Sequence, residues 1–320
     1  MSNDRFDVED YLGLDSGDVL RALVCGASSP TERRALSEGL DTAGGYTVPA
    51  VLSAQLIDLM AIQARVMQAG AALIPLDSDR NSFAKQTADP TPSWRGENQL
   101  IAESDPTFTQ VTFAPKTLAV MVRVSQELLD DSVNIGAALQ KSLARAMALE
   151  VDRVALLGTG AANEPLGVLN LAGINSVSMG ANGAAVTDYT DILDAILAMQ
   201  EDNAGEPTAA IMAPRTIRAY NGLVDTTGQP MMRPKSIENL PFLETTQMSI
   251  TQTQGSASNA SSVVLGNFSE LVIGMRNQLR IEVLKERYRE YYQVAFLAAM
   301  RVDVQAWHDE SFAKIVGIIP

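Results

Sequence analysis

Apolar residues recur about every four positions between residues 134 and 157, a spacing typical of one face of a helix. The repeating positions are Ile135, Leu139, Leu143 and Met147. Asp130 to Ser132 precede the run and offer side-chain oxygens to the free N–H groups of a helix start. Gly158-Thr159-Gly160 follows Leu157 and ends the pattern. We therefore expect one long helix, roughly 35 Å at about 1.5 Å per residue.

The region before this helix mixes one amphipathic stretch with alternating patterns. Residues 51–69 predict a helix whose apolar face carries Leu52, Leu56, Leu59 and Ile62. Residues 107–113 and 117–124 alternate in polarity, and we interpret them as two strands of a long hairpin-like excursion. The polar, proline-containing stretch between Phe83 and Pro106 is too long for a tight turn, and loops of that length are usually functional or disordered.

The region after the long helix predicts an α/β unit followed by strands. Asp188 opens a helix that ends near Asn203, residues 209–212 form a short buried strand, and Pro214 begins a further helix. We expect residues 225–262 to be irregular. Alternation or short apolar runs predict strands at 263–265, 271–273, 278–284, 292–307 and 312–316.

Composition narrows the functional classes. The 320 residues are 46% hydrophobic and only 19% charged, with a formal net charge of −14. This low charge suggests a surface largely covered by other copies of the chain, and the negative sign disfavours capture of nucleic acid through its phosphates. Cys25 is the only cysteine, so no internal disulfide forms. The acidic N-terminus lacks a signal-peptide pattern, and no apolar run approaches the roughly 20 residues that cross a bilayer.

Residues with catalytic potential have simpler interpretations. His308 is the only histidine, and we expect it to be a surface or packed side chain. Glu127 with Asp130 and Asp131 resembles a carboxylate cluster, but its position at a helix end explains it better. One cysteine and one histidine cannot build a usual zinc site. We predict no catalytic residue, no metal site and no cofactor.

The segment Trp94-Arg95-Gly96-Glu97 stands out on the predicted excursion. Tryptophan and arginine are enriched among the anchors of protein interfaces. We interpret Trp94, Arg95 and Glu97 as a docking tip, against the alternative of an ordinary solvated loop.

Several ordered segments resemble the major capsid proteins of tailed bacteriophages with the Hong Kong ninety-seven fold. They are Thr42 to Pro49, Trp94 to Glu97, Val124 to Ser132, Glu150 to Arg153 with Leu157 to Gly160 and Pro165 to Gly167, and Leu265 to Phe268. Each is weak alone, and their order and spacing carry the resemblance. It spans about Leu40 to Gly317.

The resemblance implies an α+β fold with four parts. These are an N-terminal arm (1–47), an extended β-hairpin loop (80–115), a peripheral domain (48–79, 116–186 and 285–306) with a spine helix at 134–157, and an axial domain (187–284 and 307–320). Segment 225–247 corresponds to the axial domain's inner loop, where Met231, Met232 and Phe242 are candidate inter-subunit contacts. Lys85 and Lys116 lie in or beside the extended loop, but no local motif identifies a partner asparagine or a catalytic acid, so the covalent cross-linking of some relatives is not carried over to this chain.

The implied function is self-assembly into hexamers and pentamers of an icosahedral shell that encloses double-stranded DNA without sequence-specific binding. Scaffolding, portal and decoration proteins are the implied partners, with no membrane involved. The implied location is the virion, after synthesis in the host bacterial cytoplasm. Two alternatives stay open: an encapsulin-like bacterial nanocompartment shell, and, from another class, a hydrolase that uses acidic residues such as Glu127 or Asp152.

Overall fold

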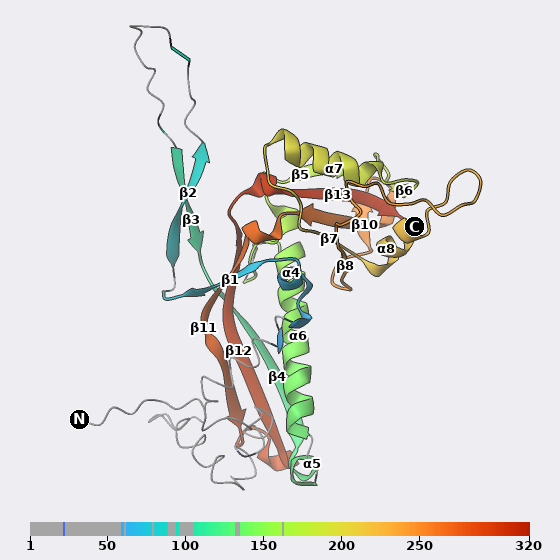
Figure 1. The fold of residues 1–320 in the computed structure, drawn as a ribbon. Helices are drawn as coiled ribbons and strands as arrows, with labels where there is room; N and C mark the ends of the chain where they lie inside the picture. Colours follow the sequence, from blue (N-terminus) through green and yellow to red (C-terminus); the bar gives the residue numbers. More distant parts are fainter. Residues whose placement is uncertain are drawn as a thin grey trace.

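The structure is a computed structural model that describes residues 22, 59–60, 62–78, 80–88, 94–95, 105, 107–131, 135–161 and 163–320. Its longest helix is α6 (Ile135–Leu157), which runs the length of the lower half of the molecule (Figure 1). Leu143, Met147 and Ala155 of this helix are almost fully buried. The predicted spine helix is therefore confirmed, and it serves as the element on which the first sheet packs.

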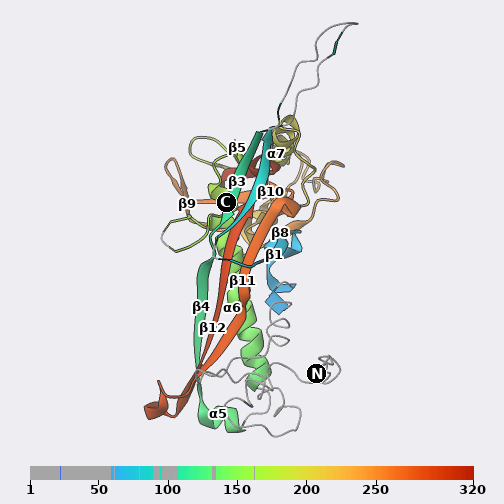
Figure 2. The same cartoon turned by 90° about the vertical axis from the view of Figure 1, so that its left-hand side faces the viewer.

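The first sheet has the strand order β1-β11-β12-β4. Its strands are β1 (Ala72–Leu76), β11 (Leu271–Leu284), β12 (Gln293–Ala306) and β4 (Lys116–Ser125). β1 runs parallel to β11, and the other pairs are antiparallel. Alternate residues of β12, such as Phe296 and Met300, join the core that includes α6. Figure 2 looks onto the opposite face of the sheet, with α6 behind the strands.

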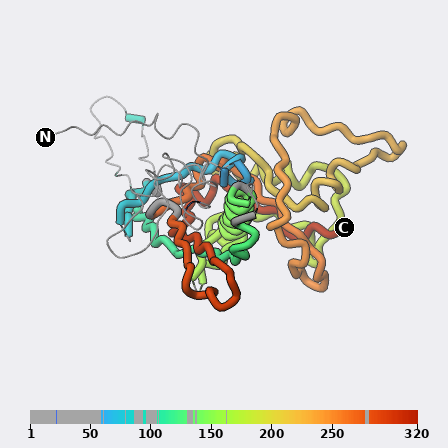
Figure 3. Tube along the Cα trace, turned by 90° about the horizontal axis from the view of Figure 1, so that it is seen from below, coloured from blue at the N-terminus to red at the C-terminus, as the bar shows by residue number. Residues whose placement is uncertain are grey.

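The second sheet has the order β5-β13-β10-β7-β8. Its strands are β5 (Asn175–Ser178), β13 (Phe312–Ile319), β10 (Ala257–Gly266), β7 (Ala209–Met212) and β8 (Phe242–Glu244), with β6 (Ala184–Ala185) beside β13 and β9 (Gln252–Gln254) beside β10. Helices α7 (Thr190–Glu201) and α8 (Pro214–Asn221) pack on one face through Ile192 and Tyr220. The other face, including Ile211, joins the core around α6. Viewed from below, this unit lies to one side of α6 (Figure 3).

The pairing of the predicted excursion differs from expectation. β3 (Thr107–Phe113) pairs with β2 (Asn81–Ala88) and not with β4. Pro115 separates β3 from β4, and β4 turns away to pair along its whole length with β12. β12 supplies a long hydrophobic partner that a two-stranded hairpin alone would lack. The β2–β3 hairpin projects from the rest of the molecule (Figure 1), as expected for the extended loop.

The helix predicted over residues 51–69 is interrupted. Residues 51–58 lie outside the described residues, and within the remainder the helix breaks at Ala64, whose ψ is 120°. α4 (Arg65–Gln68) starts anew there because the Asp152 carboxylate accepts the N–H groups of Arg65 and Val66. Ile62, predicted on the apolar face, is 68% exposed.

Two smaller expectations also change. Asp130 and Asp131 belong to a separate short helix, α5 (Gln126–Asp131), and do not precede α6 directly. The short strands predicted near 263 and 271 are the ends of β10 and β11, so that part of the region expected to be irregular is regular. In the part of the chain that the structure describes, the remaining elements are 3₁₀ turns: η2 (Val168–Asn170), η3 (Phe268–Glu270), η4 (Arg289–Tyr291) and η5 (Asp309–Ser311).

The domain boundaries stay predictions. Strand pairing nevertheless places β11 in the first sheet, although residues 187–284 were grouped with the axial domain. It likewise places β5 and β6 in the second sheet, although residues 116–186 were grouped with the peripheral domain. The N-terminal arm, residues 1–47, lies outside the described residues apart from Ala22.

Candidate functional site

The base of the β2–β3 hairpin is anchored by three aromatic rings. Phe83 of β2 and Phe113 of β3 meet edge to face at 5.6 Å, and both contact the ring of Trp307, at 5.7 and 6.4 Å. Phe113 is fully buried and lies against Gly274 of β11, where a Cβ would approach its ring to 2.8 Å. The cluster therefore attaches the hairpin to the first sheet at a position where a larger residue would displace the side chains of Leu76 and Phe113.

Polar contacts reinforce this attachment. The backbone N–H of Ala114 donates to Oδ2 of buried Asp303 at 2.7 Å. The Lys85 ammonium lies 3.9 Å from the Asp309 carboxylate, beside Trp307 in the sequence. The hairpin therefore leaves the body from a packed base, which limits the directions it can take.

The hairpin carries exposed apolar groups away from this base. Trp94 is fully exposed, and Phe108 on β3 is 63% exposed. Arg95 is also exposed, whereas Glu97 lies outside the described residues. Tryptophan is enriched among the anchor residues of protein interfaces, so an exposed tryptophan on a projecting hairpin suits a contact with another molecule.

The second group of predicted contacts lies between α8 and β8. Asp225 organises a turn by accepting hydrogen bonds from the Thr227 hydroxyl (2.6 Å), the Thr227 N–H (2.8 Å) and the Gln229 N–H (3.0 Å). The hydrogen bond from the Thr227 hydroxyl is the main cause that lowers the pKa of Asp225. Gly228 supplies the positive φ of 83° that the turn requires.

The three hydrophobic residues predicted here lie in different surroundings. Met232 is 88% exposed. Met231 and Phe242 pack partly against their own core, and the Arg233 guanidinium lies 3.9 Å from the centre of the Phe242 ring. Met232 therefore offers an exposed apolar surface, whereas Met231 and Phe242 attach the loop to the core of their own subunit.

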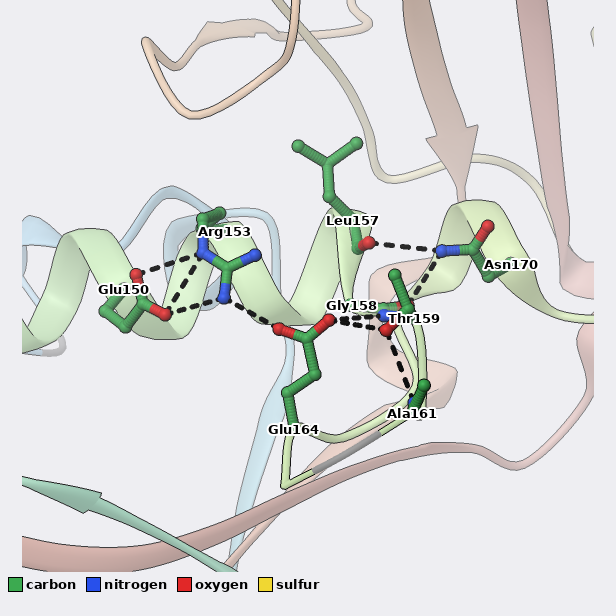
Figure 4. Close-up of polar contacts among 8 residues, drawn as sticks. All are labelled: Glu150, Arg153, Leu157, Gly158, Thr159, Ala161, Glu164 and Asn170. Atoms are coloured by element: carbon green, nitrogen blue, oxygen red, sulfur yellow. Dashed lines mark hydrogen bonds and ion pairs between the residues drawn. The ribbon is translucent and has the colours of Figure 1, made fainter.

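A hydrogen-bond network closes the turn at the end of α6 (Figure 4). Arg153 donates to both oxygens of Glu150, at 2.7–3.1 Å, and from Nη2 to Oε2 of Glu164 at 2.9 Å. Oε1 of Glu164 accepts from the N–H and hydroxyl of Thr159, at 3.0 and 2.6 Å. Asn170 caps the helix by donating to the carbonyls of Leu157 and Gly158. These contacts hold the 158–170 segment against the helix.

The network also shifts two protonation equilibria. The Thr159 hydroxyl, followed by Arg153, lowers the pKa of Glu164 to about 2. Hydrogen bonding to Glu150 raises the pKa of Arg153 above its ordinary value. Glu164 is thus held as a carboxylate beside a permanent cation, which suits a structural tie and not proton transfer.

Asp152, named in the hydrolase alternative, has a structural position. Its side chain is fully buried and accepts the N–H groups of Arg65 (2.8 Å) and Val66 (3.0 Å). Burial raises its pKa, and the two backbone hydrogen bonds oppose this rise. The carboxylate therefore joins α4 to α6. It also borders a cavity that Arg145 and Glu244 help to line, but each of its oxygens already accepts a backbone N–H group.

The remaining chemical candidates are dispersed. His308 lies 3.0 Å from Glu270 on the surface, and Glu127 is exposed at the start of α5. Within the described ranges, no three His, Cys, Asp or Glu side chains gather as metal ligands. The described part of the chain also contains no helix that is both long and apolar enough to cross a membrane.

Sequence reasoning found the exposed tip but missed both the ring cluster and the network of Arg153. Phe83 and Phe113 were visible as strand residues. Their contact with Trp307, about 200 positions away, had no local signal. Glu150 and Arg153 lie in a segment that carries the family resemblance, and Glu164 directly precedes another, so the resemblance was the available clue.

Comparisons with known proteins agree on one family. Residues 44–317 match the phage capsid family. The chain is 26% identical over 272 residues to the major capsid protein of Klebsiella oxytoca phage phiKO2, covering 81% of this chain and 63% of that protein. The chain thus spans less than two thirds of the length of that relative.

Solved structures share the fold. The capsid of a native GTA particle, computed with C5 symmetry, superposes with a TM-score of 0.64 at 21% identity, covering 81% of this chain and 91% of that one. A structure from Microbacterium phage Oxtober96 gives 0.63 at 17% identity, covering 80% and 91%. The expected α+β fold of the Hong Kong ninety-seven type is confirmed. With its spine helix, its projecting hairpin and the match over residues 44–317, the chain belongs to the phage capsid family.

Proposed function

We propose that this protein is the major capsid protein of a tailed phage and assembles into an icosahedral shell around double-stranded DNA. The observation that carries the proposal is the projecting hairpin with its solvated Trp94, in a chain that matches the phage capsid family over most of its length. Hexamers and pentamers of this chain bury these exposed groups on neighbouring copies. Apolar burial contributes roughly 25 cal/mol per Å², so many modest interfaces add up in a closed shell.

The exposed apolar groups occur at separate places, which supports contacts in several directions. Trp94 and Phe108 lie on the hairpin, Met232 lies on the loop after α8, and Tyr291 lies at the opposite end of the first sheet. A closed shell requires each subunit to meet more than one neighbour. Scaffolding, portal and decoration proteins, and a place in the virion after synthesis in a bacterial host, belong to the same proposal.

Electron microscopy of the expressed, purified protein tests the proposal. We expect hollow particles of uniform diameter, or ring-shaped capsomers when scaffolding is required. Protein that stays monomeric at all concentrations and salt conditions would contradict it. The nanocompartment alternative predicts enclosed protein cargo, so the nucleic-acid content of particles from infected cells separates the two.

A further inference from the structure

The solvent side of helix α7 carries a leucine between two acids. The buried positions of this helix face the core of the second sheet: Ile192, Ala195, Ile196 and Met199. Asp194, Leu197 and Glu201 follow one another at spacings of three and four residues, so they lie together on the opposite side. Leu197 is 52% exposed. We call Asp194, Leu197 and Glu201 the α7 face.

The charged residues around the α7 face are all acidic. Residues 186–208 contain six acids and no lysine, arginine or histidine. Asp191 is buried, and the five other acids are exposed. Among the residues that the structure describes, none of these five carboxylates forms an ion pair. The α7 face therefore presents a negative charge that its own subunit does not neutralise.

Helix α8 and the chain that returns to it present the opposite charge. Arg218 is exposed on the helix, Val224 is 55% exposed shortly after it, and Lys235 is exposed beyond the loop. The chain after this loop lies beside the end of α8, because the Arg233 guanidinium donates to the Asn221 side chain. We call Arg218, Val224 and Lys235 the α8 face. Like the α7 face, it combines charges of one sign with an exposed apolar side chain.

The remaining charges near the α8 face leave it positive. The Arg215 guanidinium donates to two backbone carbonyls, and the Arg233 guanidinium contacts an amide oxygen and an aromatic ring, so no carboxylate neutralises either one. Residues 214–240 contain four basic residues and two acids, a net charge of +2. One of these acids, Asp225, accepts the hydrogen bonds of its own turn.

The two faces lie at opposite edges of the second sheet. α7 contacts β5 and β13 at one edge, whereas α8 contacts β8 at the other. Figure 1 shows α7 at the top of this unit and α8 at its lower right. The helices meet on their inner sides, where the Tyr220 hydroxyl donates to buried Asp191. Their exposed faces are therefore available to two different neighbours, and a contact between unlike surfaces builds a ring when the rotation closes.

We propose that the α7 face of one subunit binds the α8 face of the next copy. Asp194 and Glu201 then meet Arg218 and Lys235, with Leu197 packed near Val224 between the charges. The inference rests on the proposed shell function and specifies which surfaces join neighbouring copies within a ring. Complementary charge selects this pairing, because two α7 faces or two α8 faces repel each other.

Charge reversal on each face tests the contact. The first variant carries Asp194→Lys and Glu201→Lys, and the second carries Arg218→Glu and Lys235→Glu. Each alone should raise the protein concentration needed for assembly about tenfold, since several exposed charge pairs become repulsive. An equimolar mixture of the two variants should assemble at nearly the wild-type concentration, because each reversed face finds an opposite charge on the other variant.

A control of matched net charge separates complementarity from overall charge. It adds Glu127→Lys and Glu290→Lys, at exposed positions away from the second sheet, to the second variant. This control should assemble as poorly as the second variant, whereas adding Asp194→Lys and Glu201→Lys instead should restore assembly. Recovery in both would overturn the proposal, because it would assign the effect to net charge. Melting curves check that each variant is folded.

Cross-linking of the wild-type assembly tests the contact without any substitution. A carbodiimide joins a carboxylate to a lysine amine that touches it, so we expect a link between residues 188–206 and Lys235. Mixing ¹⁵N-labelled with unlabelled copies before assembly shows whether the link joins two subunits. Particles that form without this link, or that form equally well from each variant alone, overturn the contact and leave the shell function standing. Wild-type protein that never assembles contradicts both.

Discussion

At the scale of single residues, the buried and the half-buried carboxylates of α6 and its exit turn serve different purposes. Asp152 caps α4 from a fully buried position, whereas Glu164 ties the exit turn to Arg153 near the surface. Asp152 therefore stabilises the start of α4, whereas Glu164 stabilises the turn that follows α6.

Replacing Glu164 with Gln should destabilise the folded subunit by about 0.5–1.5 kcal/mol at pH 7, because an ionic tie becomes a neutral one. The pKa of Glu164 is lowered to about 2, so its stabilisation is fully present above the ordinary glutamate pKa. It is lost as pH falls from there through about 2. Urea unfolding from pH 7 to pH 2 should show the difference between wild type and variant shrinking below about pH 4.3. The control Glu206→Gln, at an exposed position, should show no such trend.

Replacing Asp152 with Ala should destabilise the subunit by about 2–4 kcal/mol, because a buried N–H group and a partly buried one at the start of α4 lose their acceptor. Thermal or urea unfolding measures the loss. Asp194→Ala on the exposed side of α7 is the control and should stay within about 0.5 kcal/mol of wild type. Similar stability of the two variants would show that α4 is capped in another way.

At the scale of elements, we expect the two tryptophans to have different roles, one in the stability of the subunit and the other in its association. Trp307 anchors the hairpin base, and Trp94 is fully exposed on the hairpin. We expect Trp307→Ala to destabilise the subunit by about 2–4 kcal/mol and to speed amide exchange in β2 and β3. We expect Trp94→Ala to leave subunit stability unchanged and to weaken assembly by about 1–3 kcal/mol per contact. Melting curves measure the stability of both variants, and assembly titrations measure their association. A destabilised Trp94→Ala subunit, or a Trp307→Ala subunit of wild-type stability, would refute this assignment.

The segment 225–247 should gain amide protection on assembly. The turn at residues 225–229 is held mainly by Asp225, and Met232 projects into solvent, so this part of the segment has little support from the subunit core, whereas Ile237 and Leu240 are buried in it. We expect at least about tenfold slower exchange here in assembled shells than in free subunits, because axial contacts cover it. Equal protection in both states would remove its role in assembly.

At the scale of the whole molecule, exposed apolar groups at separate places predict association with concentration dependence. Sedimentation of purified protein should show capsomers or particles that grow with concentration, and the low charged share of 19% favours this association. A single monomeric species across salt and concentration would count against a shell. The Trp94→Ala variant provides the matched comparison, since its subunit fold should be unchanged.

The sequence by itself determined the elements whose signal is local. The spine helix, the buried strand at 209–212, the helix start at Pro214 and the long strand near 292–307 follow from periodicity and punctuation, and the structure contains them. The solvated tip at Trp94 was also predictable, because too few apolar residues surround it to form a core.

Only the tertiary structure decided which strands pair and which acids are buried. β3 pairs with β2 because β12 offers β4 a longer partner, and alternation within one strand cannot reveal a partner that lies 180 residues away. The break at Ala64 depends on Asp152, which approaches only when α6 packs beside α4. Contacts between residues far apart in the sequence bring these groups together, and the local pattern of apolar and polar residues does not predict such contacts.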